Sequence, residues 1–224
     1  MKIGIIGPCD FEIQPFIAEM IDLKVDTHAM LDFYLGKYRN IDIVAVRCGI
    51  CKVNAAIATQ LLIDKYDVDQ VIVTGVAGAI DEDLKIFDTV ICSEVAYHDV
   101  SDEILTKYHP KLEGLYFSTS KDLSCKITSA SADDDSVSTG KMVTGEIFIT
   151  ENGRKEIIEK YNPMCVDMET GSIAHVCHVN KMPFAAIRSM SDSPQESGED
   201  VFAKYCGDAA LKSIKVLKRY LDAL

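Results

Sequence analysis

The pattern of hydrophobic and polar positions changes period repeatedly along the 224-residue chain. Short apolar runs that begin at Lys2, Gln70 and Pro183 have the length and composition of buried strands. Two further runs, LDFYLGKY and IDIVAVRC, predict a hairpin that turns across Arg39-Asn40. The remaining predicted strands lie at 88–100, 141–149 and 164–168.

Helical periodicity separates these strands. We expect a helix after residue 9 with Asp10 as its N-cap, and a strongly apolar helix over 53–66 that is covered on more than one side. Residues 99–140 lose the periodicity, which predicts mostly loop with one helix near 120–129. Further helices are predicted at 151–161, at 169–179 and near the C-terminus, where one side carries Phe202, Cys206, Ala210, Ile214, Leu217 and Leu221.

Strands that alternate with helices predict an α/β fold with a mostly parallel or mixed sheet. No internal repeat, low-complexity block or linker interrupts the sequence. We therefore expect a single domain over residues 1–224.

The charge balance narrows the class of ligand. The chain has 35 acidic and 23 basic residues, a formal net charge of −12, and no basic stripe of the kind that binds nucleic acid. No apolar run reaches the roughly 20 residues that span a bilayer, and MKIGIIGPCDFE makes a poor signal peptide. We expect a cytoplasmic protein that binds neither nucleic acid nor membrane and acts on a neutral or zwitterionic small molecule.

The eight cysteines are expected to be reduced. The stretch CGIC places Cys48 and Cys51 at the spacing of thiol oxidoreductases, where a helix N-terminus lowers a thiol pKa. The length of the chain and the order of its elements argue against that fold, so the oxidoreductase remains a minor alternative. His175 and His178 could hold a metal, but no third ligand follows at suitable spacing, and we expect them to pack.

Acidic residues gather where the predicted strands end. Ligands bind at the carboxyl ends of strands in α/β sheets, and this edge carries Glu12, Asp167, Glu169 and Asp192. One such acid alone is more often a helix cap or a solvated charge, but four predict a shared acidic site. The central TGVAGAI has glycines that admit a close ligand, without the spacing of a dinucleotide fold or a P-loop.

Seven motifs carry a family resemblance. In order they are KIGIIG followed by Glu12, VRCGICKVNAA, VIVTGVAGAI, VAYHDV, VTGEIFI, VDMETGSIAHVC and FAAIRSMSD. Together they resemble the 5′-methylthioadenosine/S-adenosylhomocysteine nucleosidases of the nucleoside phosphorylase superfamily, with gaps mainly near residues 100–135. The resemblance implies a three-layer α/β/α sandwich with a mixed central sheet, usually a homodimer. It also implies hydrolysis of methylthioadenosine, S-adenosylhomocysteine and often 5′-deoxyadenosine with release of adenine, without a metal or organic cofactor.

Cleavage of this glycosidic bond places positive charge on the ribose and negative charge on adenine, so it needs a general acid and an activated water. By resemblance, Asp192 protonates adenine N7, Glu12 positions and deprotonates the water, and Glu169 binds the ribose hydroxyls and stabilises the cationic sugar. We expect Asp167 to be a supporting acid that points away from Glu169. The resemblance also assigns substrate contacts or their support to Met168, Phe148, Ile149, Arg188, Ser191, Ile50, Val76, Ala77, Gly78 and Phe202.

Several positions depart from the family pattern. Val76, Cys51 and Asp167 stand where Ser, Gly and Glu are common, and Ser193-Pro194 follows the acid. The resemblance implies that the partner subunit completes the 5′ pocket with its loop 100–115, in which Leu105 takes the place of an aromatic residue. These departures bear on the preference among 5′ substituents.

Two other functions remain open on the same fold. A purine nucleoside phosphorylase would need a basic phosphate pocket, but the stretch GPCDFE after the first strand carries acids and no Arg. A carboxylate beside the anomeric carbon would repel phosphate and favour water. A non-catalytic nucleoside-binding protein is disfavoured by the presence of Glu12, Glu169 and Asp192 together.

Overall fold

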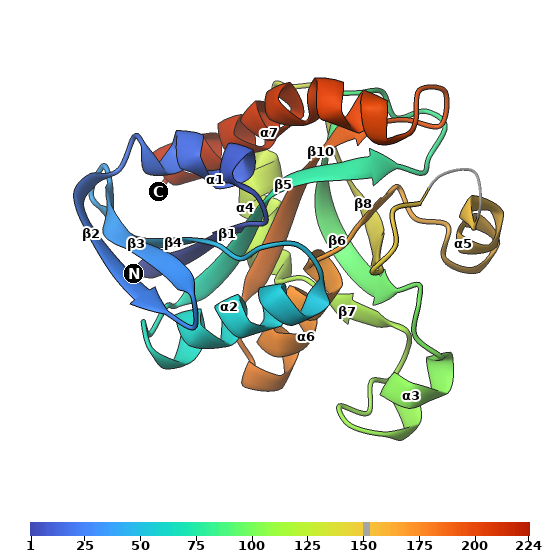
Figure 1. Ribbon diagram of the computed structural model, residues 1–224, viewed down its shortest axis with the longest axis horizontal. Coiled ribbons are helices and arrows are strands. Elements are labelled where there is room, and N and C mark those ends of the chain that lie inside the picture. Colours follow the sequence, from blue (N-terminus) through green and yellow to red (C-terminus); the bar gives the residue numbers. More distant parts are fainter. Residues whose placement is uncertain (150–152) are drawn as a thin grey trace.

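The computed structural model describes residues 1–149 and 153–224, which form ten strands and seven helices (Figure 1). The strands are β1 (Lys2–Gly7), β2 (Ile21–His28), β3 (Leu31–Tyr38), β4 (Ile41–Arg47), β5 (Gln70–Ala79), β6 (Thr89–Tyr97), β7 (Tyr116–Ser118), β8 (Val137–Thr144), β9 (Cys165–Asp167) and β10 (Phe184–Asp192). The helices are α1 (Asp10–Ile17), α2 (Lys52–Asp64), α3 (Asp102–Lys107), α4 (Lys121–Ser129), α5 (Arg154–Tyr161), α6 (Thr170–Asn180) and α7 (Glu199–Asp222).

All ten strands belong to one mixed sheet, in the order β10-β6-β8-β9-β5-β1-β4-β3-β2 with β7 beside β6. Strand β5 also pairs with β10, so β5, β10, β6, β8 and β9 close into a ring. The neighbours β1, β5 and β10 are parallel, which brings their carboxyl ends to one edge. The prediction of a single domain stays a prediction, which this continuous sheet supports.

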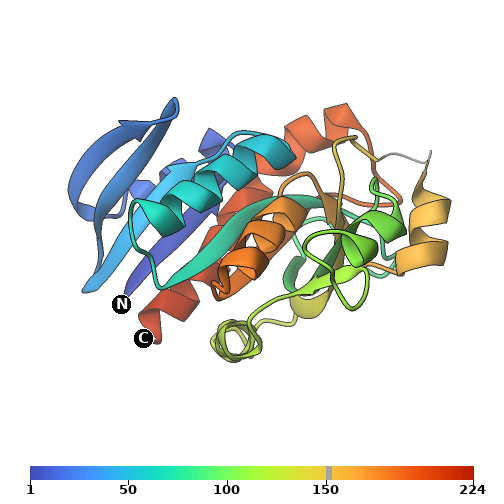
Figure 2. The same cartoon turned by 90° about the horizontal axis from the view of Figure 1, so that it is seen from below.

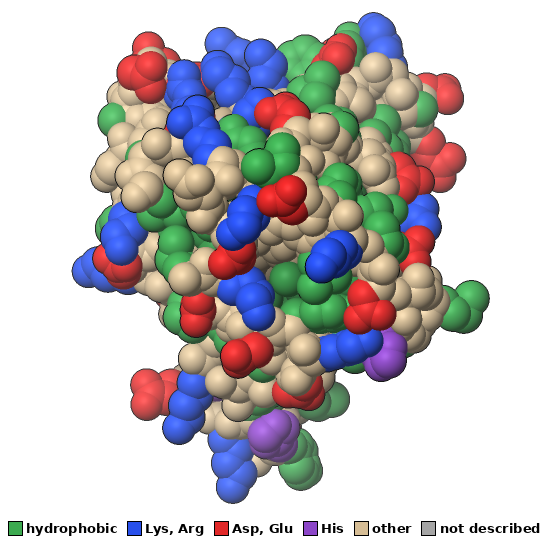
Figure 3. Space-filling view, turned by 90° about the vertical axis from the view of Figure 1, so that its left-hand side faces the viewer, with side chains coloured by type: hydrophobic (Ala, Val, Ile, Leu, Met, Phe, Trp, Pro, Cys, Tyr) green, Lys and Arg blue, Asp and Glu red, His purple; other side chains and the backbone are tan. Residues whose placement is uncertain are grey.

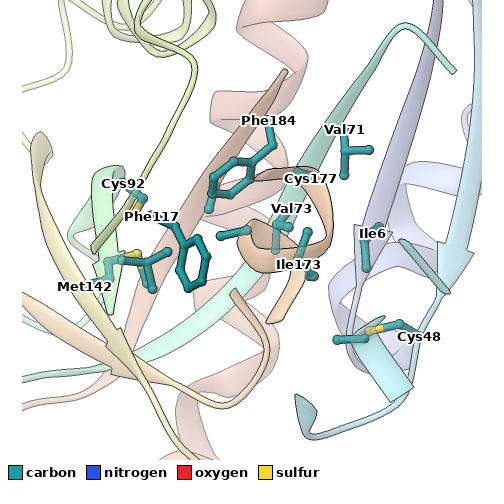
Figure 4. Close-up of a cluster of buried hydrophobic side chains, with 14 of the residues drawn as sticks. Ile6, Cys48, Val71, Val73, Cys92, Phe117, Met142, Ile173, Cys177 and Phe184 are labelled. Atoms are coloured by element: carbon teal, nitrogen blue, oxygen red, sulfur yellow. The ribbon is translucent and has the colours of Figure 1, made fainter. Parts of the chain in front are cut away.

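Alternate residues of the central strands face two helical layers. Ile5 of β1 and Ile72 of β5 are buried in a cluster with α1, α4 and α7. The residues that follow them, Ile6 and Val73, face the opposite way and pack with α2 and α6 (Figure 4). A strand buried on both faces needs such an unbroken apolar sequence. The predicted α/β sandwich with a mixed sheet is therefore confirmed.

Three details differ from the sequence-based expectations, and a fourth cannot be compared. Strand β2 was not predicted, although its sequence alternates apolar and charged residues as strands do, and most of its side chains are exposed. Short elements α3 and β7 interrupt the region expected to be mostly loop. Strand β8 covers 137–144 rather than 141–149, because Gly145 follows it and a short turn begins there. The predicted start of a helix at Glu151 lies outside the described residues.

One prediction about the helices is wrong. The N-cap of α1 is Cys9, not Asp10, because Glu12 reaches back to the backbone N–H of Cys9 in a capping box. Within one chain, helix α2 packs on α6 and β1, while Val53 is 67% and Ile57 42% exposed, so the predicted cover on more than one side stays a prediction. The predicted helix near 120–129 and the hairpin across Arg39-Asn40 are confirmed.

The hairpin of β2 and β3 lies at the opposite end of the molecule from α3, and both termini lie near the hairpin (Figures 1 and 2). On the face that carries the hairpin, basic and acidic side chains are interspersed (Figure 3). Lys37–Asp42 and Lys65–Asp26 are ion pairs of this region. Among the described residues, no helix combines the length and apolar composition that crossing a bilayer requires.

Candidate active site

A cavity of about 380 Å³ opens at the carboxyl-terminal edge of β1, β5 and β10. Its lining is mostly apolar with several acids, which is typical of a small-molecule site. The lining residues are Pro8, Cys9, Phe11, Glu12, Ile50, Val76, Ala77, Gly78, Phe148, Val166, Asp167, Met168, Glu169, Ser191, Asp192, Glu199 and Phe202.

Glu12 stands in the first turn of α1 and is buried, with an exposed fraction of 2%. Its Oε1 accepts the backbone N–H of Val76 at 2.8 Å, and its Oε2 accepts that of Cys9 at 2.7 Å. Burial raises the pKa of Glu12, while the guanidinium of Arg188 and both N–H donors act in the opposite direction. The carboxylate is thus fixed in orientation and is a stronger base than an exposed Glu.

The guanidinium of Arg188 is fully buried and lies among three carboxylates. Its Nη2 is 2.6 Å from Asp167 Oδ2 and 3.4 Å from Glu169 Oε2, and its Nη1 is 3.6 Å from Glu12 Oε1. Burial alone would lower the pKa of Arg188, but the three carboxylates outweigh it and raise it. We call these four residues the Arg188 cluster. It carries three acids for one base.

Asp167 and Glu169 point toward the same guanidinium, so the expectation that they diverge is wrong. Residues two apart in an extended chain lie on one side. Their other partners differ: Asp167 accepts from the backbone N–H and hydroxyl of Thr170, whereas Glu169 Oε1 accepts the backbone N–H of Cys51 at 3.0 Å. Burial raises the pKa of Glu169, and Arg188 opposes that shift. Both acids line the cavity, but Asp167 has more hydrogen-bond partners within the protein than Glu169, which stands at the start of α6.

Asp192 ends strand β10 and is 1% exposed. Its Oδ1 accepts a hydrogen bond from the Ser191 hydroxyl at 3.0 Å. Burial raises its pKa to about 6, and the hydrogen bond and the charge of Arg154 only partly offset the shift. An acid with this pKa can hold its proton near neutrality and release it to a bound base.

Two glycines of β5 make room for these carboxyl groups. A Cβ at Gly75 would lie 2.3 Å from Glu12 Oε1 and 2.5 Å from Arg188 Nη1, so a larger residue would separate the ion pair. A Cβ at Gly78 would lie 3.1 Å from Asp192 Oδ2. The Gly-x-x-Gly spacing that is weak as a sequence signal therefore serves the acids of the site.

Aromatic rings form part of the cavity wall. Phe202 packs edge-on against Phe11 and Phe148, with ring centroids 6.4 Å and 6.0 Å away. Ile149 lines a smaller adjoining cavity that shares Phe148, Met168 and Asp192 with the main one. These rings provide apolar faces on which a planar base can stack.

The structure brings together nearly all of the predicted site residues. Only Arg188 and Ile149 are absent from the main cavity lining: Arg188 lies beneath the acids, and Ile149 lies in the adjoining cavity. Sequence reasoning missed Pro8, Cys9, Phe11, Val166 and Glu199. Pro8, Cys9 and Phe11 could have been predicted as lining residues, because they follow β1 directly and lie beside Glu12 in the sequence.

The remaining titratable groups fit other roles. Burial raises the pKa of Cys48 and also that of Cys51, whereas a redox-active thiol needs a lowered pKa. His175 stacks on Phe117 with centroids 4.9 Å apart, and His178 meets the same ring edge-on, which confirms that they pack. Within residues 1–149 and 153–224, no three His, Cys, Asp or Glu side chains are placed to hold a metal ion.

Comparison with known proteins bears on this site. A family model described as the phosphorylase superfamily matches residues 2–222. A protein from Exiguobacterium sp. (strain ATCC BAA-1283 / AT1b), named 5′-methylthioadenosine/S-adenosylhomocysteine nucleosidase, is 36% identical over 97% of this chain and 96% of its own length. The chain belongs to the 5′-methylthioadenosine/S-adenosylhomocysteine nucleosidase family. The resemblance carried by the seven motifs is confirmed.

Solved structures agree with membership of the nucleosidase family. The family member from Colwellia psychrerythraea 34H, solved in complex with adenine, has a TM-score of 0.90 and 34% identity, and covers 99% of this chain and 95% of that one. A futalosine hydrolase of Helicobacter pylori strain 26695 has a TM-score of 0.91 at 26% identity, and covers 100% and 98%. The same fold therefore also occurs in a protein that is named as a futalosine hydrolase.

Cys51, which departs from the nucleosidase pattern, has an unusual backbone conformation. Cys51, at a position where Gly is common, has a φ of 76°, in the region that favours glycine. Its backbone N–H is the one that binds Glu169. The unfavourable backbone conformation therefore coincides with a contact to the site.

Proposed function

We propose that the chain hydrolyses the N-glycosidic bond of 5′-methylthioadenosine and S-adenosylhomocysteine, with 5′-deoxyadenosine as a further candidate substrate. The products are adenine and the 5-thioribose compound, which places the enzyme in methionine salvage and the recycling of S-adenosylmethionine by-products. The observation that carries the proposal is one cavity whose buried acids have different environments. Glu12 and Glu169 lie in the Arg188 cluster, and Asp192 lies outside it with a pKa of about 6.

Asp192 is the general acid of the proposed reaction. Adenine leaves with negative charge unless N7 is protonated, so a proton donor at the base lowers the barrier. A carboxyl group with a pKa of about 6 is protonated in about one molecule in ten at pH 7. A stacked base would exclude water from Asp192 and further favour its neutral form.

Glu12 and Glu169 act at the sugar. Glu12, held by two backbone N–H groups, positions and deprotonates the attacking water. Glu169 accepts the ribose hydroxyls, and Met168 packs on the ribose beside it. The excess of negative charge in the Arg188 cluster stabilises the oxocarbenium-like sugar of the transition state. Asp167 neutralises Arg188 and orients it.

The cavity wall binds the rest of the nucleoside. The Phe148 ring stacks on adenine, and the backbone of Ile149 reads the edge of the base. Ser191 orients the acid through its hydrogen bond to Asp192. The remaining wall is formed by Ile50, Val76, Ala77, Gly78 and Phe202. Protonation of adenine by Asp192 and activation of water by Glu12 account for the cleavage, so we propose no metal or organic cofactor.

Water rather than phosphate is the proposed nucleophile. No Lys or Arg lines the cavity among the described residues, and Arg188 is already engaged by three carboxylates. Phosphate would meet the negative charge of Glu12 and Glu169 without a free cation to bind it. This electrostatic barrier favours hydrolysis over phosphorolysis.

A homodimer would complete the 5′ end of the cavity. Ile50, Val53 and Ile57 at and after the start of α2 are exposed apolar residues, as are Ile104 and Tyr108 of the segment 100–115. Such residues are typical of a surface that a second protein covers. We propose that the partner's segment 100–115, including its Leu105, adjoins Ile50. We also propose that the enzyme works in the cytoplasm.

The experiment is to incubate the protein with methylthioadenosine, with and without phosphate, and to follow free adenine. Equal adenine release under both conditions is expected. Release that requires phosphate would instead show a phosphorylase, and binding without release would show a nucleoside-binding protein. Repeating the assay with S-adenosylhomocysteine ranks the two 5′ substituents.

A further inference from the structure

A circuit of charged groups lies beside the cavity. Lys52 Nζ donates to both carboxylate oxygens of Asp99, at 2.9 Å each. Asp99 Oδ2 also accepts the backbone N–H of Glu146 at 3.0 Å, and Glu146 Oε1 accepts the backbone N–H of Lys52 at 3.2 Å. The three residues therefore form a closed loop of hydrogen bonds between the start of α2, the segment after β6 and the turn after β8.

Two members of this circuit, Lys52 and Glu146, are close in sequence to residues of the active site. Lys52 directly follows Cys51, whose N–H binds Glu169, and Ile50, which lines the cavity. Glu146 lies two residues before Phe148, the aromatic wall. The circuit thus fixes the position of the Phe148 segment relative to the segment that supports Glu169. None of its three members lines the cavity.

The Lys52–Asp99 pair is more than a surface ion pair. Its side chains are 21% and 22% exposed, whereas those of Lys126–Asp122 on α4 are 57% and 78% exposed. The Lys52 ammonium also lies 5.1 Å from the centroid of the Tyr97 ring. Loss of one partner would leave a partly desolvated charge unpaired, while exposed pairs contribute little.

We propose that Lys52, Asp99 and Glu146 are positioning residues that hold the Phe148 wall and the Cys51 amide in place for binding the adenine nucleoside. The inference rests on the proposed nucleosidase function. It assigns to the circuit an effect on substrate binding rather than on the chemical step. Asp99 is the member that receives hydrogen bonds from both sides, so it is the best place to open the circuit.

The test is the steady-state kinetics of Asp99→Asn with methylthioadenosine, next to Asp122→Asn as a matched control. Misplacement of a binding wall by a fraction of an ångström is expected to raise KM about tenfold and to change kcat less than about threefold. The inhibition constant of adenine should rise by the same factor as KM. The control should match the wild type, and thermal unfolding and gel filtration confirm that each variant keeps its fold and association state.

Two more variants keep the proposal open to refutation if Asp99→Asn does not fold. Glu146→Gln changes an exposed side chain and should raise KM about two- to threefold. Lys52→Met should raise KM as Asp99→Asn does, and the double variant should add little, because both changes open one circuit. A KM at the wild-type value in Glu146→Gln and Lys52→Met, or a loss confined to kcat, would overturn the inference. A wild-type protein without adenine release would refute the proposed function instead.

Discussion

At one end of the site, three carboxylates surround the buried guanidinium of Arg188. At the other end, Asp192 has a hydroxyl as its hydrogen-bond donor, and no ion pair to it is found among the described residues. The two regions use one type of acid in different surroundings, and burial raises the pKa of Glu12, Glu169 and Asp192 alike. In the first region the guanidinium of Arg188 opposes this shift and favours the charged form, whereas no ion pair of this kind within the described residues opposes it at Asp192. This contrast separates the proposed sugar chemistry from the proposed base chemistry.

The largest expected effect comes from removing the cation of the first region. Arg188→Met leaves three buried carboxylates without their counter-charge, so we expect a loss of about 3–5 kcal/mol in the free energy of unfolding at pH 7. The loss should shrink at low pH, where the acids take up protons. Urea denaturation at pH 5 and pH 8 measures both. A loss below about 1 kcal/mol at pH 8 would contradict the electrostatic account of the Arg188 cluster.

The opposite sign is expected in the second region. The folded-state pKa of Asp192, about 6, lies above the ordinary value of 3.8 for an aspartate, so its contribution to stability is present below pH 3.8 and is lost as the pH rises to 6. Asp192→Asn removes that cost and should stabilise the protein by about 1–3 kcal/mol at pH 8, and much less at pH 4. Thermal unfolding at these two pH values measures it. An unchanged or lower melting temperature at pH 8 would mean that burial does not disfavour the charged acid.

The same pKa predicts the pH dependence of catalysis. Because Asp192 must carry a proton, kcat/KM for methylthioadenosine should fall about tenfold per pH unit above an apparent pKa near 6. Glu12 must be ionised and its pKa is raised, so an acidic limb is expected as well. A pH–rate profile of the wild type tests both limbs. A flat profile up to pH 9 would exclude Asp192 as the acid that limits the rate.

The smallest effect is expected at the thiol that lies outside both regions. Cys48 is buried, is absent from the cavity lining, and has a raised pKa. Cys48→Ser should keep kcat within about twofold and lower stability by about 1 kcal/mol, because a hydroxyl replaces a buried thiol. The adenine-release assay and urea denaturation measure the two quantities. Loss of most activity would revive the thiol oxidoreductase hypothesis.

The sequence predicted the fold where burial imposes a pattern. Strands such as β1, β5 and β10 are apolar on both faces and were identified, whereas the exposed edge strand β2 left no such signal. The acids of the site were found because they follow strand ends. The meeting of Asp167 and Glu169 at Arg188 was missed, because it depends on how β9, α6 and β10 pack. The circuit of Lys52, Asp99 and Glu146 joins residues up to 94 positions apart, which no local pattern reveals.

The central claim is that Asp192 protonates the leaving base, and a comparison of two leaving groups tests it most directly. The measurement is the kcat of Asp192→Asn relative to the wild type for methylthioadenosine and for the 4-nitrophenyl glycoside of 5-methylthioribose, whose leaving group departs without a proton. The account predicts a loss of about 10³-fold or more for methylthioadenosine and less than about tenfold for the nitrophenyl compound. Equal losses for the two substrates would contradict it.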